Sequence, residues 1–141
     1  MFENNNKKIV IDTNILVSSV LFPESITAKV LHKAMTYWEI YISQTAINEF
    51  LEVISRNKFD KYFLNRPNGR EIFTENFLKS VIIVEPTEKI NDCQDPKDNQ
   101  FLEIAVCVNA VYLVTGDKKD LLSMNPYRGI EIITAREFLE R

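Results

Sequence analysis

Short runs of β-branched and other apolar residues recur along the chain, each followed by a longer segment with helical periodicity. We expect strands at Ile9–Ile11, Ile40–Ile42, Val81–Val84, Tyr112–Val114 and Ile130–Ile133. These runs are apolar at consecutive positions, which is typical of parallel strands covered by helices on both faces. Right-handed crossovers through the intervening helices then predict an α/β fold, a three-layer α/β/α sandwich with a central parallel five-stranded sheet.

Three of the intervening segments carry clear signals for the start of a helix. An apolar stripe at helical spacing predicts a helix over Gln44–Ile54, with Ser43 as its N-cap. A second stripe predicts a helix over Pro96–Val108, where Asp95 would cap a first turn that begins with proline. Thr134-Ala135-Arg136-Glu137 has the pattern of a capping box, so we expect it to open a short last helix.

Length and composition indicate a soluble globular protein. The 141 residues suit one domain with a substantial core, so we expect residues 1–141 to form a single domain. A net charge of −3 gives no overall attraction to nucleic acid, so a polyanion would need a local basic patch or metal ions. The polar N-terminus lacks a signal peptide and no run is long enough to span a membrane, so the expected location is the cytoplasm.

The two cysteines, Cys93 and Cys107, suit a reducing compartment, and their spacing is not that of zinc ligands. Cys107 has apolar neighbours on both sides in the sequence. We therefore expect a buried and unreactive thiol at this position.

Four acidic residues are placed where an α/β sheet binds ligands. Asp12 and Asp117 directly follow predicted strands, so both should project from the carboxyl ends of the sheet. Asp98 should lie on the same side of its helix as the apolar stripe. Glu49 lies at the edge of the apolar arc of its helix, whereas Glu52 turns further towards solvent. Glu49 is therefore the better candidate of the two for a shared site.

Carboxylates that gather in one place repel one another unless a cation or a proton compensates. The cluster therefore indicates a hard divalent metal, Mg²⁺ or Mn²⁺, and metal-assisted hydrolysis. Asp12 and Asp117 are the expected primary ligands, followed by Asp98. Glu49 could bind a metal through water or position the attacking water. Thr13, the neighbour of Asp12, could hold that carboxylate in orientation.

Each acid also has a plainer interpretation. Asp12 and Asp117 could be N-caps of the helices after their strands. Asp98 could merely favour the helix dipole, and Glu49 could be a solvated helix acid. Asp120 is open to two interpretations, a further ligand or an N-cap, of which we favour the cap. The metal hypothesis therefore rests on convergence of the acids, since no one of them is specific.

Five segments, in this order, resemble the PIN-domain ribonucleases, close to the VapC-like branch described as toxins of toxin–antitoxin systems. The matching segments are Ile9–Asn14, Ser43–Phe50, Asp95–Leu102, Leu113–Leu121 and Ile132–Leu139. The resemblance covers residues 8–140, nearly the whole chain. It implies an acidic metal site with polar supports, formed by Asp12, Glu49, Asp98 and Asp117 with Asn14 and Thr115.

The resemblance also implies an activity and partners. The expected activity is that of an Mg²⁺- or Mn²⁺-dependent endoribonuclease that cleaves single-stranded RNA. The expected partners are a cognate antitoxin protein and a second copy of the chain in a homodimer. Every acidic position of the family pattern is present, so we find no sign of a catalytically dead member.

A basic and aromatic stretch offers candidate substrate contacts. Arg56, Lys58 and Lys61 are the expected contacts, and Arg66 and Arg70 add to the positive charge. Interleaved aromatic rings suit phosphate contacts combined with base stacking. The alternative is a solvated amphipathic helix with its aromatic rings in the core. The segment 59–79 should form one or two helices, interrupted at residues 67–69 by a Pro-Asn-Gly sequence.

Two other functions fit parts of the sequence. A PIN-like RNA-binding module without catalytic activity would retain the fold, and only a cleavage assay separates it from the enzyme. A phosphoacceptor receiver domain also places an aspartate and Mg²⁺ at the end of a strand. That domain needs an acidic pair after the first strand and a lysine after the last. Here Asp12 is flanked by Ile11 and Thr13, and Thr134-Ala135-Arg136 follows the last expected strand, so both features are missing.

Overall fold

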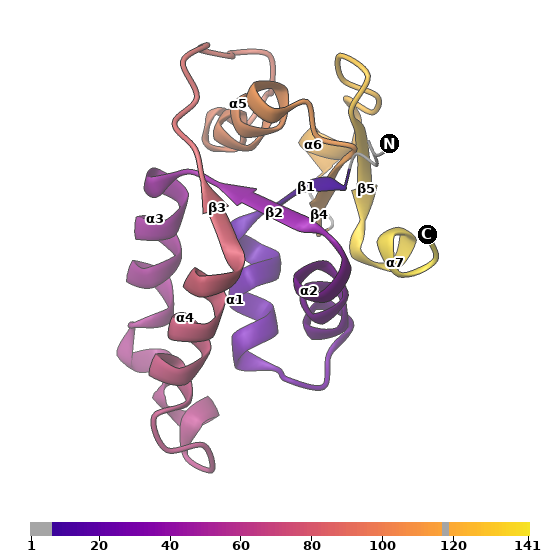
Figure 1. The fold of residues 1–141 in the computed structure, drawn as a ribbon. Coiled ribbons are helices and arrows are strands. Elements are labelled where there is room, and N and C mark those ends of the chain that lie inside the picture. Colours follow the sequence, from indigo (N-terminus) through magenta and orange to yellow (C-terminus); the bar gives the residue numbers. More distant parts are fainter. Residues whose placement is uncertain (1–6, 117–118) are drawn as a thin grey trace.

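A parallel five-stranded sheet in the order β3-β2-β1-β4-β5 forms the centre of the molecule (Figure 1). The computed structural model describes residues 7–116 and 119–141. The strands are β1 (Lys8–Ile11), β2 (Glu39–Ile42), β3 (Val81–Ile83), β4 (Tyr112–Thr115) and β5 (Glu131–Thr134). All four neighbouring pairs are parallel. The predicted parallel α/β sheet is confirmed, with strand boundaries within a residue or two of those expected.

Helices cover this sheet on both faces. They are α1 (Thr13–Leu21), α2 (Ile26–Tyr37), α3 (Gln44–Ile54), α4 (Gly69–Ser80), α5 (Asn99–Val108), α6 (Lys119–Leu122) and α7 (Ala135–Leu139), with 3₁₀ turns η1 (Asn57–Phe63) and η2 (Pro96–Asp98). In Figure 1, α5 lies on one side of the sheet, and α1 and α2 lie on the other. No single described helix is long and apolar enough to cross a membrane; α1 and α2 pass that test only as a pair bent by 109°.

The predicted capping residues begin their helices as expected. The Ser43 hydroxyl accepts a hydrogen bond from the backbone in the first turn of α3, and Asp95 does the same for η2. Thr134 and Glu137 form the reciprocal capping box of α7. The helix expected over residues 96–108 differs in its first turn, because Pro96–Asp98 is a 3₁₀ turn that leads into α5.

The strand order reverses at β1. The chain passes from β1 to β2 and β3 on one side, and then returns to place β4 and β5 on the other side. The carboxyl ends of β1 and β4 are therefore neighbours, with Ile11 opposite Val114 in the register. In open α/β sheets, ligands bind in the crevice outside the strand ends at such a reversal. The fold thus predicts the position of the site before any side chain is considered.

Two expectations about burial need correction. The strand β3 is not covered on both faces, since Ile82 and Ile83 are 41% and 49% exposed at the edge of the sheet. Cys107 is exposed, although its sequence neighbours are apolar. The apolar stripe of α5 lies on the opposite side of that helix, so neighbours in sequence point in different directions. The buried thiol is Cys93, in the loop before α5.

Candidate active site

Asp12 is fully buried where β1 ends and α1 begins. Its Oδ1 atom accepts a hydrogen bond of 3.0 Å from the backbone N–H of Ile15, so Asp12 does cap α1. Its Oδ2 atom accepts a hydrogen bond from the hydroxyl of Thr115, at the end of β4. Each carboxylate oxygen has a second lone pair, so capping does not prevent metal ligation. The contact also places Thr115 beside Asp12, where the resemblance put a polar support.

Glu49 connects two distant segments at the same edge of the sheet. This exposed carboxylate on α3 accepts hydrogen bonds from Thr13 Oγ1 at 3.0 Å and from Gln100 Nε2 at 3.3 Å. The same Gln100 amide donates to the carbonyl oxygen of Lys97 at 3.1 Å. Thr13 follows Asp12 directly, and its hydroxyl donates to Glu49, although the sequence suggested that it would orient Asp12. Glu49 therefore lies between the end of β1 and the turn that carries Asp98.

Asp98 is only 2% exposed, where η2 leads into α5. It lines a pocket of about 190 Å³ together with Asp95, Lys119 and Asp120. Burial raises the pKa of the Cys93 thiol, and the carboxylates of Asp98 and Asp120 raise it further. Both carboxylates therefore lie within electrostatic reach of one buried group. The structure brings Asp98 and Asp120 to one place.

Asp120 does not have the position that we favoured from the sequence. It lies inside α6 (Lys119–Leu122), so it is not the N-cap of that helix. The position of Asp120 before two leucines is typical of a helix cap, and nothing nearby in the sequence points to a pocket beside Asp98. Its partly buried side chain in the acidic pocket revives the alternative, a further ligand.

Asp117 and Asn14 are the remaining residues predicted for this site. Asp117 lies outside the described residues, so its assignment as a ligand stays a prediction. Asn14 is exposed in the first turn of α1. It lines a second pocket, of about 270 Å³, that also includes Thr13 and Glu49. Asn14 is thus next to the acidic site on the side that leads along α1.

The expected substrate contacts lie on and before η1. Arg56 follows the end of α3 and is paired with Glu52 of that helix at 2.8 Å. The exposed amines of Lys58 and Lys61 lie 5.1 Å and 5.4 Å from the ring centres of Phe59 and Tyr62. Both rings are half-buried against the core. The lysines, unlike Arg56, keep their charge on an open surface.

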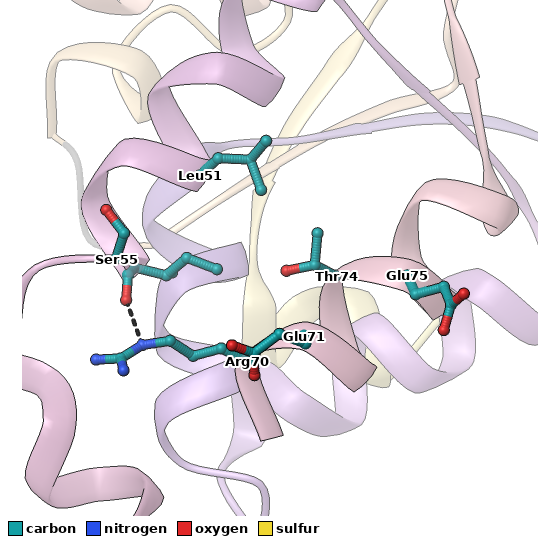
Figure 2. A pocket seen from close by; sticks show the side chains of 7 residues that line it. Leu51, Ser55, Arg70, Glu71, Thr74 and Glu75 are labelled. Atoms are coloured by element: carbon teal, nitrogen blue, oxygen red, sulfur yellow. Dashed lines mark hydrogen bonds between the residues drawn. The ribbon is translucent and has the colours of Figure 1, made fainter. Parts of the chain in front are cut away.

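Arg66 and Arg70 hold the chain together through backbone carbonyl groups. Arg66 donates to the carbonyl oxygens of Val20 and Leu21 at 2.9 and 3.2 Å, which ties it to the end of α1. Arg70 donates from Nε to the carbonyl oxygen of Ile54 at 2.6 Å, the bond drawn in Figure 2. Both guanidinium groups therefore have structural partners. The general expectation that they add to a phosphate-binding surface loses its support.

The donors at the acidic site fit a hard divalent ion. Asp12, Glu49 and Asp98 offer only oxygen ligands, as Mg²⁺ and Mn²⁺ prefer. The Oε1 atom of Gln100, beside Glu49, is buried and has no hydrogen-bond partner among the described residues. Within residues 7–116 and 119–141, no three His, Cys, Asp or Glu side chains stand close enough to hold a metal. The described acids would therefore need a further ligand, and Asp117 is the predicted one.

The fold is a parallel α/β/α sandwich, and the buried Asp12 lies at its strand-order reversal, where open α/β sheets bind ligands. The chain belongs to the PIN domain family, whose family model matches residues 8–119. The uncharacterized protein MJ1680 of Methanocaldococcus jannaschii is 32% identical over 142 residues, which cover 94% of this chain and 90% of that protein.

A solved structure extends the likeness to the fold. The crystal structure of VapBC2 from Rickettsia felis, bound to a DNA fragment from its promoter, contains a chain that superposes with a TM-score of 0.59. The match covers 90% of this chain and 98% of that chain, at 17% sequence identity. At this identity the likeness shows a shared fold. The resemblance to the PIN domain, drawn first from five sequence segments, is confirmed.

Proposed function

We propose that this protein is an Mg²⁺- or Mn²⁺-dependent endoribonuclease that cleaves single-stranded RNA. PIN domains are generally nucleases that use divalent metal ions, which supports hydrolysis of a phosphodiester. The observation that carries the proposal is the fully buried carboxylate of Asp12, held by Thr115 at the reversal of strand order. A buried carboxylate at the carboxyl ends of parallel strands lies where an α/β sheet binds its ligands, and its oxygens are the atoms that Mg²⁺ and Mn²⁺ prefer.

Asp12, Asp98 and the predicted ligand Asp117 would hold the metal. A bound divalent ion would supply a polarised phosphate and a water molecule with a lowered pKa. The chain itself orients the groups around it. Thr115 donates to one oxygen of Asp12, while the Ile15 N–H fixes the other.

Glu49 has the exposure that contact with water and substrate requires. Thr13 and Gln100 both donate to its Oε1 atom, and these two bonds fix the carboxylate between the end of β1 and α5. A carboxylate held in this way can orient the attacking water or accept its proton. We assign this role to Glu49.

We further propose that the protein is the toxin of a toxin–antitoxin pair in the cytoplasm, acting as a homodimer. The shared fold with the VapBC2 structure supports this assignment. A cognate antitoxin would then be encoded beside the gene, and its co-expression should relieve growth arrest caused by this chain. Light scattering should report about twice the mass of one chain at micromolar concentration, since a specific interface normally persists there.

The central test compares the wild type with Asp12→Asn. Asparagine is as good an N-cap as aspartate, so the melting temperature should change little. Cleavage of single-stranded RNA with Mn²⁺ should fall by a factor on the order of 100 or more, because the ligand charge is lost. Double-stranded RNA and a chelator provide the controls. Equal cleavage by the two proteins would remove Asp12 from the site, and RNA binding without cleavage under any metal would favour the non-catalytic module.

A further inference from the structure

The pocket beside Glu49 continues away from the acids along one side of α1. Its volume is about 270 Å³. The end next to the acids is polar and is formed by Thr13, Asn14 and Glu49. Its other walls are largely apolar, and they include Val17, Phe22 and Val53. Apolar walls with a few polar groups at one end are typical of sites for flat organic groups such as nucleobases.

Phe22 forms the far end of this pocket and is unusual among the described phenylalanines in being 45% exposed. It lies eight residues after Asn14, or about 12 Å along the helix axis. The Phe22 ring packs edge-on against Tyr62, with ring centres 5.1 Å apart. Arg66 bonds to the last carbonyl groups of α1, immediately before Phe22. The exposed ring is therefore fixed in place before any ligand arrives.

Aromatic rings and lysines continue the same line beyond Phe22. The rings of Tyr62 and Phe59 have centres 6.2 Å apart. Lys61 and Lys58 each place an exposed amine near one of these two rings. Rings that stack on bases, alternating with cations that meet phosphates, are the usual surface for single-stranded nucleic acid. The pocket and η1 together form a track that leads from Glu49 to Lys58.

We propose that the nucleotides on one side of the cleaved phosphate lie along this track. One base enters the pocket beside Asn14 and Val17, the next base stacks on Phe22, and the following phosphates meet Lys61 and Lys58. The inference rests on the proposed ribonuclease function and adds the path of the substrate. The groove between α3 and α4 in Figure 2 is a poorer path, because Glu71 and Glu75 line it and would repel phosphates.

The first test measures binding of a fluorescent single-stranded oligoribonucleotide, with Asp12→Asn as the background so that the RNA stays intact. Phe22→Ala should weaken binding about tenfold, within the range of one base–aromatic stack. Phe22→Trp should restore binding, because it retains a stacking face. Tyr37→Ala is the matched control, since Tyr37 is also an exposed ring but lies at the end of α2. Melting curves identify any variant that is merely unfolded.

The second test uses the charge. Lys61→Ala should reduce the slope of log affinity against log salt by about one contact, roughly 0.7 for single strands. Lys79→Ala removes another exposed lysine, on α4, and should leave the slope unchanged.

A third test pairs the ring with the base. A series of oligonucleotides, each lacking the base at one position, is measured with the background protein and with Phe22→Ala. At one position, removing the base should weaken binding to the background protein but cause no further loss in Phe22→Ala. In the cleaving enzyme, Phe22→Ala should raise KM and leave kcat largely unchanged.

The outcomes separate the two proposals. If the wild type cleaves RNA while Phe22→Ala and Lys61→Ala bind like the background protein, the track is wrong and the nuclease stands. If the wild type does not cleave RNA but its binding depends on Phe22 and Lys61, the track stands and the nuclease proposal is wrong. Equal loss of binding in Phe22→Ala and Phe22→Trp, with both folded, would also overturn the stacking contact.

Discussion

Two charged regions of the molecule differ in how far their charged side chains are buried and in what those side chains contact. The acid edge, comprising Asp12, Glu49 and Asp98, either buries its carboxylates or holds them with side chains from distant elements. The basic segment, residues 56–70, leaves its lysines on the surface and ties its later arginines to backbone carbonyl groups. Charge therefore concentrates in both regions, but it is available for different purposes.

This difference shows that the function of a cluster of like charges cannot be assigned until the partners of each charged group are known. Five cations in the basic segment resembled one phosphate-binding surface in the sequence. In the fold, Arg66 and Arg70 stabilise the packing of helices, and only Lys58 and Lys61 remain open to a ligand. At the acid edge, by contrast, Asp12 and Asp98 are buried, and Asp12 is held by hydrogen bonds from Ile15 and Thr115 at the ends of two parallel strands, where an α/β sheet binds ligands.

The largest expected effect separates two glutamates of α3. Glu49→Gln should lower Mn²⁺-dependent cleavage by a factor of about 100 to 10,000, the usual contribution of a positioned acid or base. Glu52→Gln is the matched control, because Glu52 lies on the same helix and pairs with Arg56. It should retain wild-type activity. Steady-state cleavage of single-stranded RNA measures both. Similar losses in the two variants would erase the distinction between the acid edge and the rest of α3.

The next effect concerns stability in the basic segment. Arg66→Ala should lower the free energy of unfolding by about 2–3 kcal/mol, because three backbone carbonyl groups lose their donor. Lys61→Ala should stay within about 0.5 kcal/mol of the wild type, as is usual for surface substitutions. Urea unfolding provides the comparison. If Lys61→Ala is as destabilising as Arg66→Ala, the division between structural and available cations is wrong.

The smallest effect tests Asp120 at the border of the acid edge. Since Asp120 is inside α6 and not its cap, Asp120→Ala should change stability by less than about 0.5 kcal/mol. Its removal from the pocket of Asp98 should weaken Mn²⁺ binding about tenfold, the lower end of the range for groups around a metal. Calorimetry with Mn²⁺ and a melting curve measure the two quantities. A loss of about 1 kcal/mol with unchanged Mn²⁺ affinity would restore the cap interpretation.

Much of the local structure was predictable from the sequence. The five strands, the caps at Ser43 and Asp95 and the capping box of α7 agree with expectation. Each of these features depends on residues that lie a few positions apart, so a short window contains the whole interaction. The choice of Glu49 over Glu52 rested on helical spacing alone, and the structure places only Glu49 beside Thr13.

The contacts between residues that are distant in the sequence depended on the tertiary structure. It joined Asp12 to Thr115 across 103 positions, left β3 exposed at the sheet edge and turned Cys107 towards solvent. It also placed Asp120 in the acidic pocket, where the sequence had suggested a helix cap. The physical reason is the range of the forces involved. Propensity and capping act within a turn of helix, whereas strand order, burial and charge pairing depend on packing between segments that are distant in the chain.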